Sequence, residues 1–128
     1  MANRTDRGGG PGDENMTKAP TIARVWRGRT RRTQADDYEA YNYEVGIRPL
    51  IEKALGVQTF REDREDDSLF MTISYWADEA SMAAFTGADP RKIHHLPRDR
   101  EFLIELPASV EILKLRHTHG DLGQSRQD

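Results

Sequence analysis

The sequence contains no cysteine among its 128 residues. Disulfide bonds, thiolate zinc sites, iron–sulfur clusters and cysteine nucleophiles all need the sulfur of this residue, so each of them is excluded. A chain without cysteine fits the reducing cytoplasm, and we therefore expect a cytoplasmic protein.

Long apolar runs and basic tracts are missing as well. No stretch approaches the roughly 18 apolar residues that cross a bilayer, so we expect neither a membrane span nor a signal peptide. The chain carries 19 Lys and Arg against 22 Asp and Glu, a net charge of −3, and the basic residues form no tract. Counterion release then gives no drive toward nucleic acid, and DNA and RNA are not expected as partners.

Glycine and aromatic residues are unevenly distributed along the chain. The segments 1–20 and 117–128 hold six of the ten glycines and none of the ten aromatic residues. Such segments bury too little apolar surface to offset chain entropy, so we expect two disordered tails around one folded domain at 21–116. The glycine run at 8–12 lacks the strand and the lysine of a phosphate loop. His117 and His119 lack a third ligand, and no metal site is expected.

Within 21–116, the spacing of apolar residues predicts an α+β fold. Runs of β-branched and aromatic residues predict strands. Apolar residues three and four positions apart, between a capping residue and a glycine, predict helices. The segment 102–106 fits either a helix or a strand. Thr33 is the expected cap of the first helix and Asp78 that of the second, while Gly28 is expected to close the first strand and Gly46 and Pro49 to interrupt the first helix. The expected strands are 21–26, 57–62, 69–76 and 110–115, and the expected helices are 34–45, a short stretch at 50–55, the segment between Asp78 and Gly87, and a turn at 90–95.

This order, β-α-β-β-α-β, is the ferredoxin-like split βαβ arrangement, an antiparallel sheet with both main helices on one face. The first and third strands nevertheless have apolar residues on both faces of the sheet. Trp26 and Val25 point to opposite faces of the first strand, and Phe70 and Met71 point to opposite faces of the third. Two main helices can cover only one face of a sheet. We therefore expect the second face to pack on another copy of the chain in a homodimer.

Three segments of the sequence resemble the antibiotic biosynthesis monooxygenase family of dimeric α+β barrels. They are IARVWRGRT at 22–30, YWADEASMAAFTG at 75–87 and PRDREFLIEL at 97–106, and the resemblance covers about 22–115. It implies a dimeric barrel and, as one activity of the family, oxygenation of phenolic or quinol-like aromatic substrates without flavin or metal. In that chemistry the substrate carbanion passes an electron to dioxygen, and the protein deprotonates, orients and shields it.

The resemblance directs attention to polar and aromatic residues near the expected sheet. Histidine is the apt base at neutral pH, arginine can hold a phenolate, and aromatic walls can stack on rings. The spacing from Trp76 favours His95 over the adjacent His94, because neighbours on a helical turn point about 100° apart. The expected catalytic residues are His95, Arg24 and Tyr75, and the expected substrate-binding residues are Trp26, Tyr41 and His94.

Two alternatives stay open. The first is a noncatalytic or stress-related barrel whose cavity only sequesters a small ligand or is filled by side chains. The second is the heme-degrading branch of the same superfamily, which uses an asparagine on the first strand, a tryptophan in the second helix and a histidine about ten residues later. His95 stands at the histidine place, but Phe85 replaces the tryptophan and the first strand has no asparagine. No cofactor is therefore expected.

The domain boundaries lead to a first prediction. Removal of 1–20 and 117–128 should leave the melting temperature within a few degrees of that of the full chain, because neither segment has the composition to pack. Differential scanning calorimetry of the trimmed and full chains measures this. A drop of many degrees would mean that a tail docks on the fold.

Overall fold

The computed structural model describes residues 19–87 and 89–122, so most of the expected tails lie outside the described residues. The chain forms a four-stranded antiparallel sheet in the order β2-β3-β1-β4, which confirms the α+β ferredoxin-like arrangement. The strands are β1 (Ile22–Arg31), β2 (Gly56–Asp63), β3 (Asp67–Trp76) and β4 (Glu111–Lys114). No helix within 19–87 or 89–122 has the length and apolarity to cross a bilayer.

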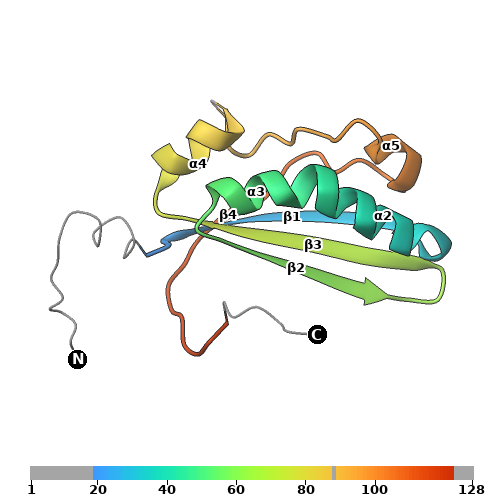
Figure 1. Cartoon of the computed structure of the whole chain (residues 1–128), viewed down its shortest axis with the longest axis horizontal. Coiled ribbons are helices and arrows are strands. Elements are labelled where there is room, and N and C mark those ends of the chain that lie inside the picture. The colour runs from blue at the N-terminus through green and yellow to red at the C-terminus, as the bar shows by residue number, and fades with distance from the viewer. Residues whose placement is uncertain (1–18, 88, 123–128) are drawn as a thin grey trace, which may run out of the picture.

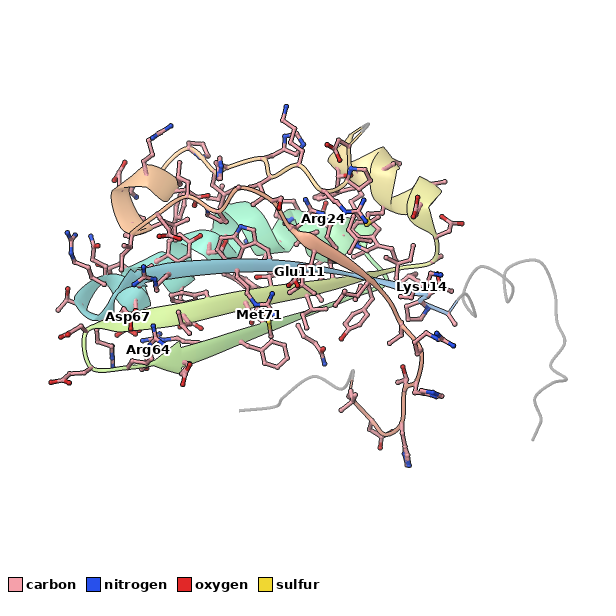
Figure 2. All side chains as sticks on the ribbon, turned by 180° about the vertical axis from the view of Figure 1, so that it is seen from behind. Arg24, Arg64, Asp67, Met71, Glu111 and Lys114 are labelled. Atoms are coloured by element: carbon pink, nitrogen blue, oxygen red, sulfur yellow. The ribbon has the colours of Figure 1, made fainter. Side chains whose placement is uncertain are left out.

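The helices lie together on one side of the sheet (Figure 1). They are η2 (Arg32–Gln34), α2 (Ala35–Asn42), η3 (Tyr43–Ile47), α3 (Arg48–Lys53), α4 (Glu79–Thr86) and α5 (Asp99–Phe102). Along β3, burial alternates strictly between buried and half-buried residues. The buried set, which includes Phe70 and Trp76, faces the helices, and the half-buried set, which includes Met71 (labelled in Figure 2), faces away.

Two groups of aromatic side chains join the layers. Tyr38 of α2 is fully buried and packs edge-on against Phe70 of β3, with Phe102 of α5 beside it. At the other end of the molecule Trp76 is 1% exposed and packs on Phe85 of α4, as expected for an anchor between sheet and helix. The Asp78 cap of α4 is confirmed, because its carboxylate accepts a hydrogen bond from the Ser81 amide.

The expectation that Gly28 ends the first strand is wrong. β1 runs on to Arg31, paired with β3 at every position from Ile22 to Arg31. An added Cβ at Gly28 would lie 2.4 Å from Cη2 of Trp26, so the indole lies directly over this glycine. Gly28 therefore marks a close approach of a ring to the strand and not a strand end.

The expected interruption of the first helix at Gly46 and Pro49 is also wrong. The helix passes from α2 into the π turn η3, where the Arg48 amide donates to the carbonyl of Tyr43, five residues earlier, and continues as α3. Pro49, which has no backbone N–H to donate, comes directly after this turn. It therefore lies where the hydrogen-bond spacing of the helix has already changed from four residues to five. At the start of α2, the capping position is Gln34 without a side-chain bond, and not Thr33.

The expected helical turn at 90–95 does not form. After a turn at Pro90 and Arg91, Lys92 makes an isolated bridge to Ser109, and 93–96 has no helical structure. The backbone of Lys92 pairs with Ser109, just before β4, and this pairing replaces the helical turn that the short local pattern predicts. The ambiguous stretch 102–106 splits, since Phe102 ends α5 and Leu103 bridges to Thr30 of β1.

Candidate functional site

A cavity of about 260 Å³ lies between the sheet and the helical layer. Its sheet side is formed by Arg24 and Trp26 of β1 and Thr72 of β3, which is the direct partner of Trp26 in the strand register. Most of the other lining is apolar and comes from three elements: the helix around the π turn, the end of α4 and the segment that follows α4. These apolar residues include Val45, Ile47, Leu50, Phe85, Ile93 and Leu96. The site is therefore a largely apolar pocket with a few polar groups.

The segment 89–98, which we call the strap, crosses from α4 to α5 and closes one side of the cavity. Figure 1 shows it running between these two helices on the helical side of the sheet. The Val110 amide donates to the carbonyl of Arg91, and the Arg98 amide donates to the phenolic oxygen of Tyr41 at 2.7 Å. The strap is thus held at both ends without regular secondary structure of its own.

Arg24 holds the beginning of the strap from the sheet. Its Nε donates to the carbonyl of Pro90 at 2.9 Å, and its Nη2 donates to that of Lys92 at 3.1 Å. Figure 2 shows Arg24 between the sheet and the segment above it. Burial lowers the pKa of Arg24, yet a guanidinium stays charged at neutral pH. In the described part of the chain no carboxylate pairs with it, and two of its five N–H groups are used on the strap.

His94 lines the cavity from the strap, and its Nε2 lies 2.7 Å from the carbonyl oxygen of Thr86. A carbonyl can only accept a hydrogen bond, so Nε2 carries the proton. In neutral His94 the other ring nitrogen, Nδ1, then holds the free lone pair. The backbone therefore fixes the tautomer and leaves Nδ1 as the proton acceptor.

Tyr38 and Asp99 form a buried pair that also lines the cavity. The Tyr38 hydroxyl donates to Oδ1 of Asp99 at 3.2 Å, and the Leu96 amide donates to Oδ2 at 2.9 Å. Burial raises the pKa of Asp99, and these two hydrogen bonds together with nearby His95 only partly offset that effect. Burial, and next the Asp99 carboxylate, raise the pKa of Tyr38, so its phenol stays protonated.

The structure brings three of the six sequence-predicted site residues to the cavity, namely Arg24, Trp26 and His94. His94 and His95 are both exposed, but only His94 lines the cavity, because the strap is not the helical turn that the spacing argument assumed. Tyr75 lies in register with Ala23 on the sheet face away from the helices, where its hydroxyl donates to Oε1 of Gln58. Tyr41 is half-buried and stacks on Phe102 at the edge of the core.

Asp99 and Phe85 are cavity residues that sequence reasoning missed or assigned elsewhere. Asp99 stands between Arg98 and Arg100, which is the pattern of a solvated surface, and nothing in that pattern signals a buried carboxylate. Phe85, which the sequence analysis considered only as the replacement of a tryptophan, packs on Trp76 and also lines the cavity. A heme bound through His95 does not fit this arrangement, because His95 does not line the cavity.

Comparison with known proteins supports the fold. No family model matches the sequence, and no curated protein matches it in a sequence search. Among solved structures, a Bacillus cereus protein provisionally named an antibiotic biosynthesis monooxygenase superposes with a TM-score of 0.56 over 80% of this chain and 100% of its own. The identity is 8%, so the likeness shows a shared fold and carries no residue of the site with it.

The packing of Trp26 on Gly28 gives a prediction for the sheet side of the cavity. Gly28→Ala should displace the indole, change the near-ultraviolet circular dichroism and destabilise the fold by about 1–3 kcal/mol, because the new Cβ overlaps the ring. In a Trp26→Leu background the same substitution should have little effect on stability. Gly56→Ala is the matched control, since its Cβ would meet only Tyr75 Cδ2 at 3.6 Å. Equal effects of Gly28→Ala in both backgrounds would contradict the contact.

Proposed function

We propose that this protein binds a small aromatic compound in the cavity and oxygenates it without flavin or metal, as a cytoplasmic homodimer. The observation that carries the proposal is that two polar side chains line one largely apolar pocket of the described chain. They are His94, whose Nδ1 keeps its lone pair, and the half-buried Arg24, which has no carboxylate partner. The apolar lining suits an aromatic ring, and the two polar groups suit a phenolic oxygen. The fold shared with a protein provisionally named a monooxygenase supports the proposed oxygenation.

In this proposal, Nδ1 of His94 accepts the proton of the phenolic hydroxyl, and Arg24 stabilises the resulting oxyanion. His94 thus takes the role that the sequence suggested for His95. The electron-rich ring reduces dioxygen at an activated CH2 carbon, where one CH2 group and one dioxygen give one C=O group and one water. The pocket's contribution is to orient the ring and to exclude bulk water.

Turnover of anthrone-like or quinol compounds in air tests the assignment, with no flavin or metal added. His94→Gln should reduce turnover by about 10²–10⁴-fold, because the amide can still donate to the Thr86 carbonyl but cannot accept a proton as a base. His95→Gln is the matched control and should change turnover less than about twofold.

Three other outcomes have distinct meanings. Loss of turnover in His95→Gln alone would restore the original assignment of the base. Saturable binding of these compounds without turnover would favour the alternative of a sequestering barrel. If the compounds are neither bound nor turned over, the oxygenase proposal and the sequestering alternative are both contradicted.

The second part of the proposal concerns the sheet face that the helices leave uncovered in the described chain. Apolar side chains from three strands of this face are half-buried or exposed, including Phe60 at 46% and Leu113 at 51%. Leu69, Met71 and Ile73 of β3 lie on the strand next to Phe60, and Leu113 lies beyond β1 on β4, while Arg27 and Glu111 pair with each other. A continuous apolar patch on one sheet face favours association, and a second copy of the same face is the occupant we propose.

Light scattering of the full chain should give twice the chain mass of 14.6 kDa. Phe60→Glu should shift the mass toward the monomer, because it places a charge within the proposed apolar contact. Ile51→Glu is the matched control, since Ile51 is similarly exposed at 51% but lies on α3. A monomeric wild-type protein at micromolar concentration would contradict the dimer.

A further inference from the structure

A second, smaller cavity lies beside the first, and no step of the proposed chemistry uses it. It has a volume of about 60 Å³ and lies between the helix that runs from α2 into η3 and the strands β2 and β3. Asn42, Ile47 and Thr72 line both cavities, so these side chains form a common wall. We call the smaller cavity the side pocket.

The side pocket opens at a different place on the surface from the main cavity. Tyr43 and Thr59 line the side pocket but not the main cavity, and both are exposed. The exposed lining of the main cavity includes Val45, Phe85 and His94, which do not line the side pocket. An aromatic ligand held at His94 would therefore occupy the main opening and leave the second one free.

The size of the side pocket selects small molecules. One water needs roughly 10–15 Å³ of such space, and sites for drug-sized ligands have about 300–1,000 Å³. The side pocket lies between these limits, so it admits a diatomic gas but no aromatic ring. Its buried end includes Ile47 at 5% and Phe70 at 6% exposure. Since apolar cavities stay dry and take up apolar gases, this end favours dioxygen over water.

Two polar groups at the common wall have no hydrogen-bond partner among the described residues. Thr72 is 6% exposed and belongs to the buried set of β3, so its hydroxyl lies on the helical side of the sheet. The amide oxygen of Asn42 would lie 2.7 Å from a Cβ added at Gly46, so this side chain lies against the π turn. Both side chains can donate to an anion. Glu39, the carboxylate in the lining of the side pocket, is exposed and pairs with Arg61.

We propose that the side pocket is the dioxygen site of the proposed reaction, and that Thr72 and Asn42 donate hydrogen bonds to the superoxide that forms there. The inference rests on the proposed oxygenation, and it adds where dioxygen enters and which groups hold its reduced form. Hydrogen bonds to an anion are much stronger than those to a neutral molecule, so these donors stabilise superoxide more than dioxygen.

The electrons and atoms of this step balance without a further reagent. The deprotonated ring passes one electron to dioxygen, which gives a ring radical and the superoxide anion. These two combine through one C–O bond, and the resulting peroxide anion takes back the proton that His94 accepted. Loss of one water from this hydroperoxide then gives the C=O group.

Xenon-pressurised crystals of the full chain test the side pocket without any substrate. Xenon should bind in the side pocket of the wild-type protein, because xenon enters apolar cavities of this kind. Thr59 pairs in register with Thr72, so it shares the helical face of the sheet, and Thr59→Trp should fill the pocket and exclude xenon. Val57→Trp is the matched control, since it adds the same ring to the same face of β2 but lines neither cavity.

Turnover of an anthrone-like compound at several dioxygen concentrations tests the chemistry. Thr72→Val should lower kcat/KM for dioxygen about 10- to 100-fold, because superoxide loses a hydrogen bond, and should leave KM for the aromatic compound within about twofold. Thr72→Ser keeps the hydroxyl and should restore most of the wild-type value. Thr59→Trp should also lower kcat/KM for dioxygen, because it closes the route, whereas Val57→Trp should not.

Three results would overturn the dioxygen site and leave the proposed function standing. They are wild-type crystals without xenon in the side pocket, an unchanged kcat/KM for dioxygen in Thr72→Val and Thr59→Trp, and a loss in Thr72→Val that Thr72→Ser does not restore. Absence of turnover by the wild-type protein would overturn the proposed function and the dioxygen site together.

Discussion

The hydrogen bonds from Arg24 to the carbonyls of Pro90 and Lys92 are the interactions on which the cavity depends. They connect the sheet to the strap across the apolar space, and a charged donor bonded to a neutral acceptor contributes about 1.5–3 kcal/mol. Because the guanidinium cannot lose its charge near neutral pH, this connection does not change in that range. The same residue therefore closes the pocket and supplies its positive end.

The helical side of the cavity depends on the π turn. In a regular helix from Ala35 to Lys53, each residue would be rotated by about 100° from the one before it, and this rotation would fix which side chains of α3 continue the apolar face of α2. The wider turn at Tyr43–Ile47 changes that relation, and three of its residues, Val45, Gly46 and Ile47, line the cavity. An added Cβ at Gly46 would lie 3.0 Å from Leu96, so the helix and the strap are in close contact there. π turns are often found at functional sites, which agrees with this position.

The sequence predicts the topology well because the topology depends on long periodic segments. The run of apolar, β-branched and aromatic residues in β3 and the Asp78 cap of α4 are strong local signals, and the strand and the cap are both confirmed. Gly28 and Pro49 misled the prediction because a glycine or proline has the same local signature whether it ends an element or fits a close contact within it. The placement of His94 rather than His95 at the cavity depends on the pairing of Lys92 with Ser109, which no local pattern encodes.

The strap is attached mainly through main-chain atoms. Arg24 bonds to two of its carbonyls, Val110 to a third, and Asp99 and Tyr41 accept bonds from two of its amides. Substitution of strap side chains such as Ile93 removes none of these bonds. Natural variation can therefore alter the shape and polarity of this wall without opening it, so that ligand preference is able to diverge between related proteins while the architecture persists.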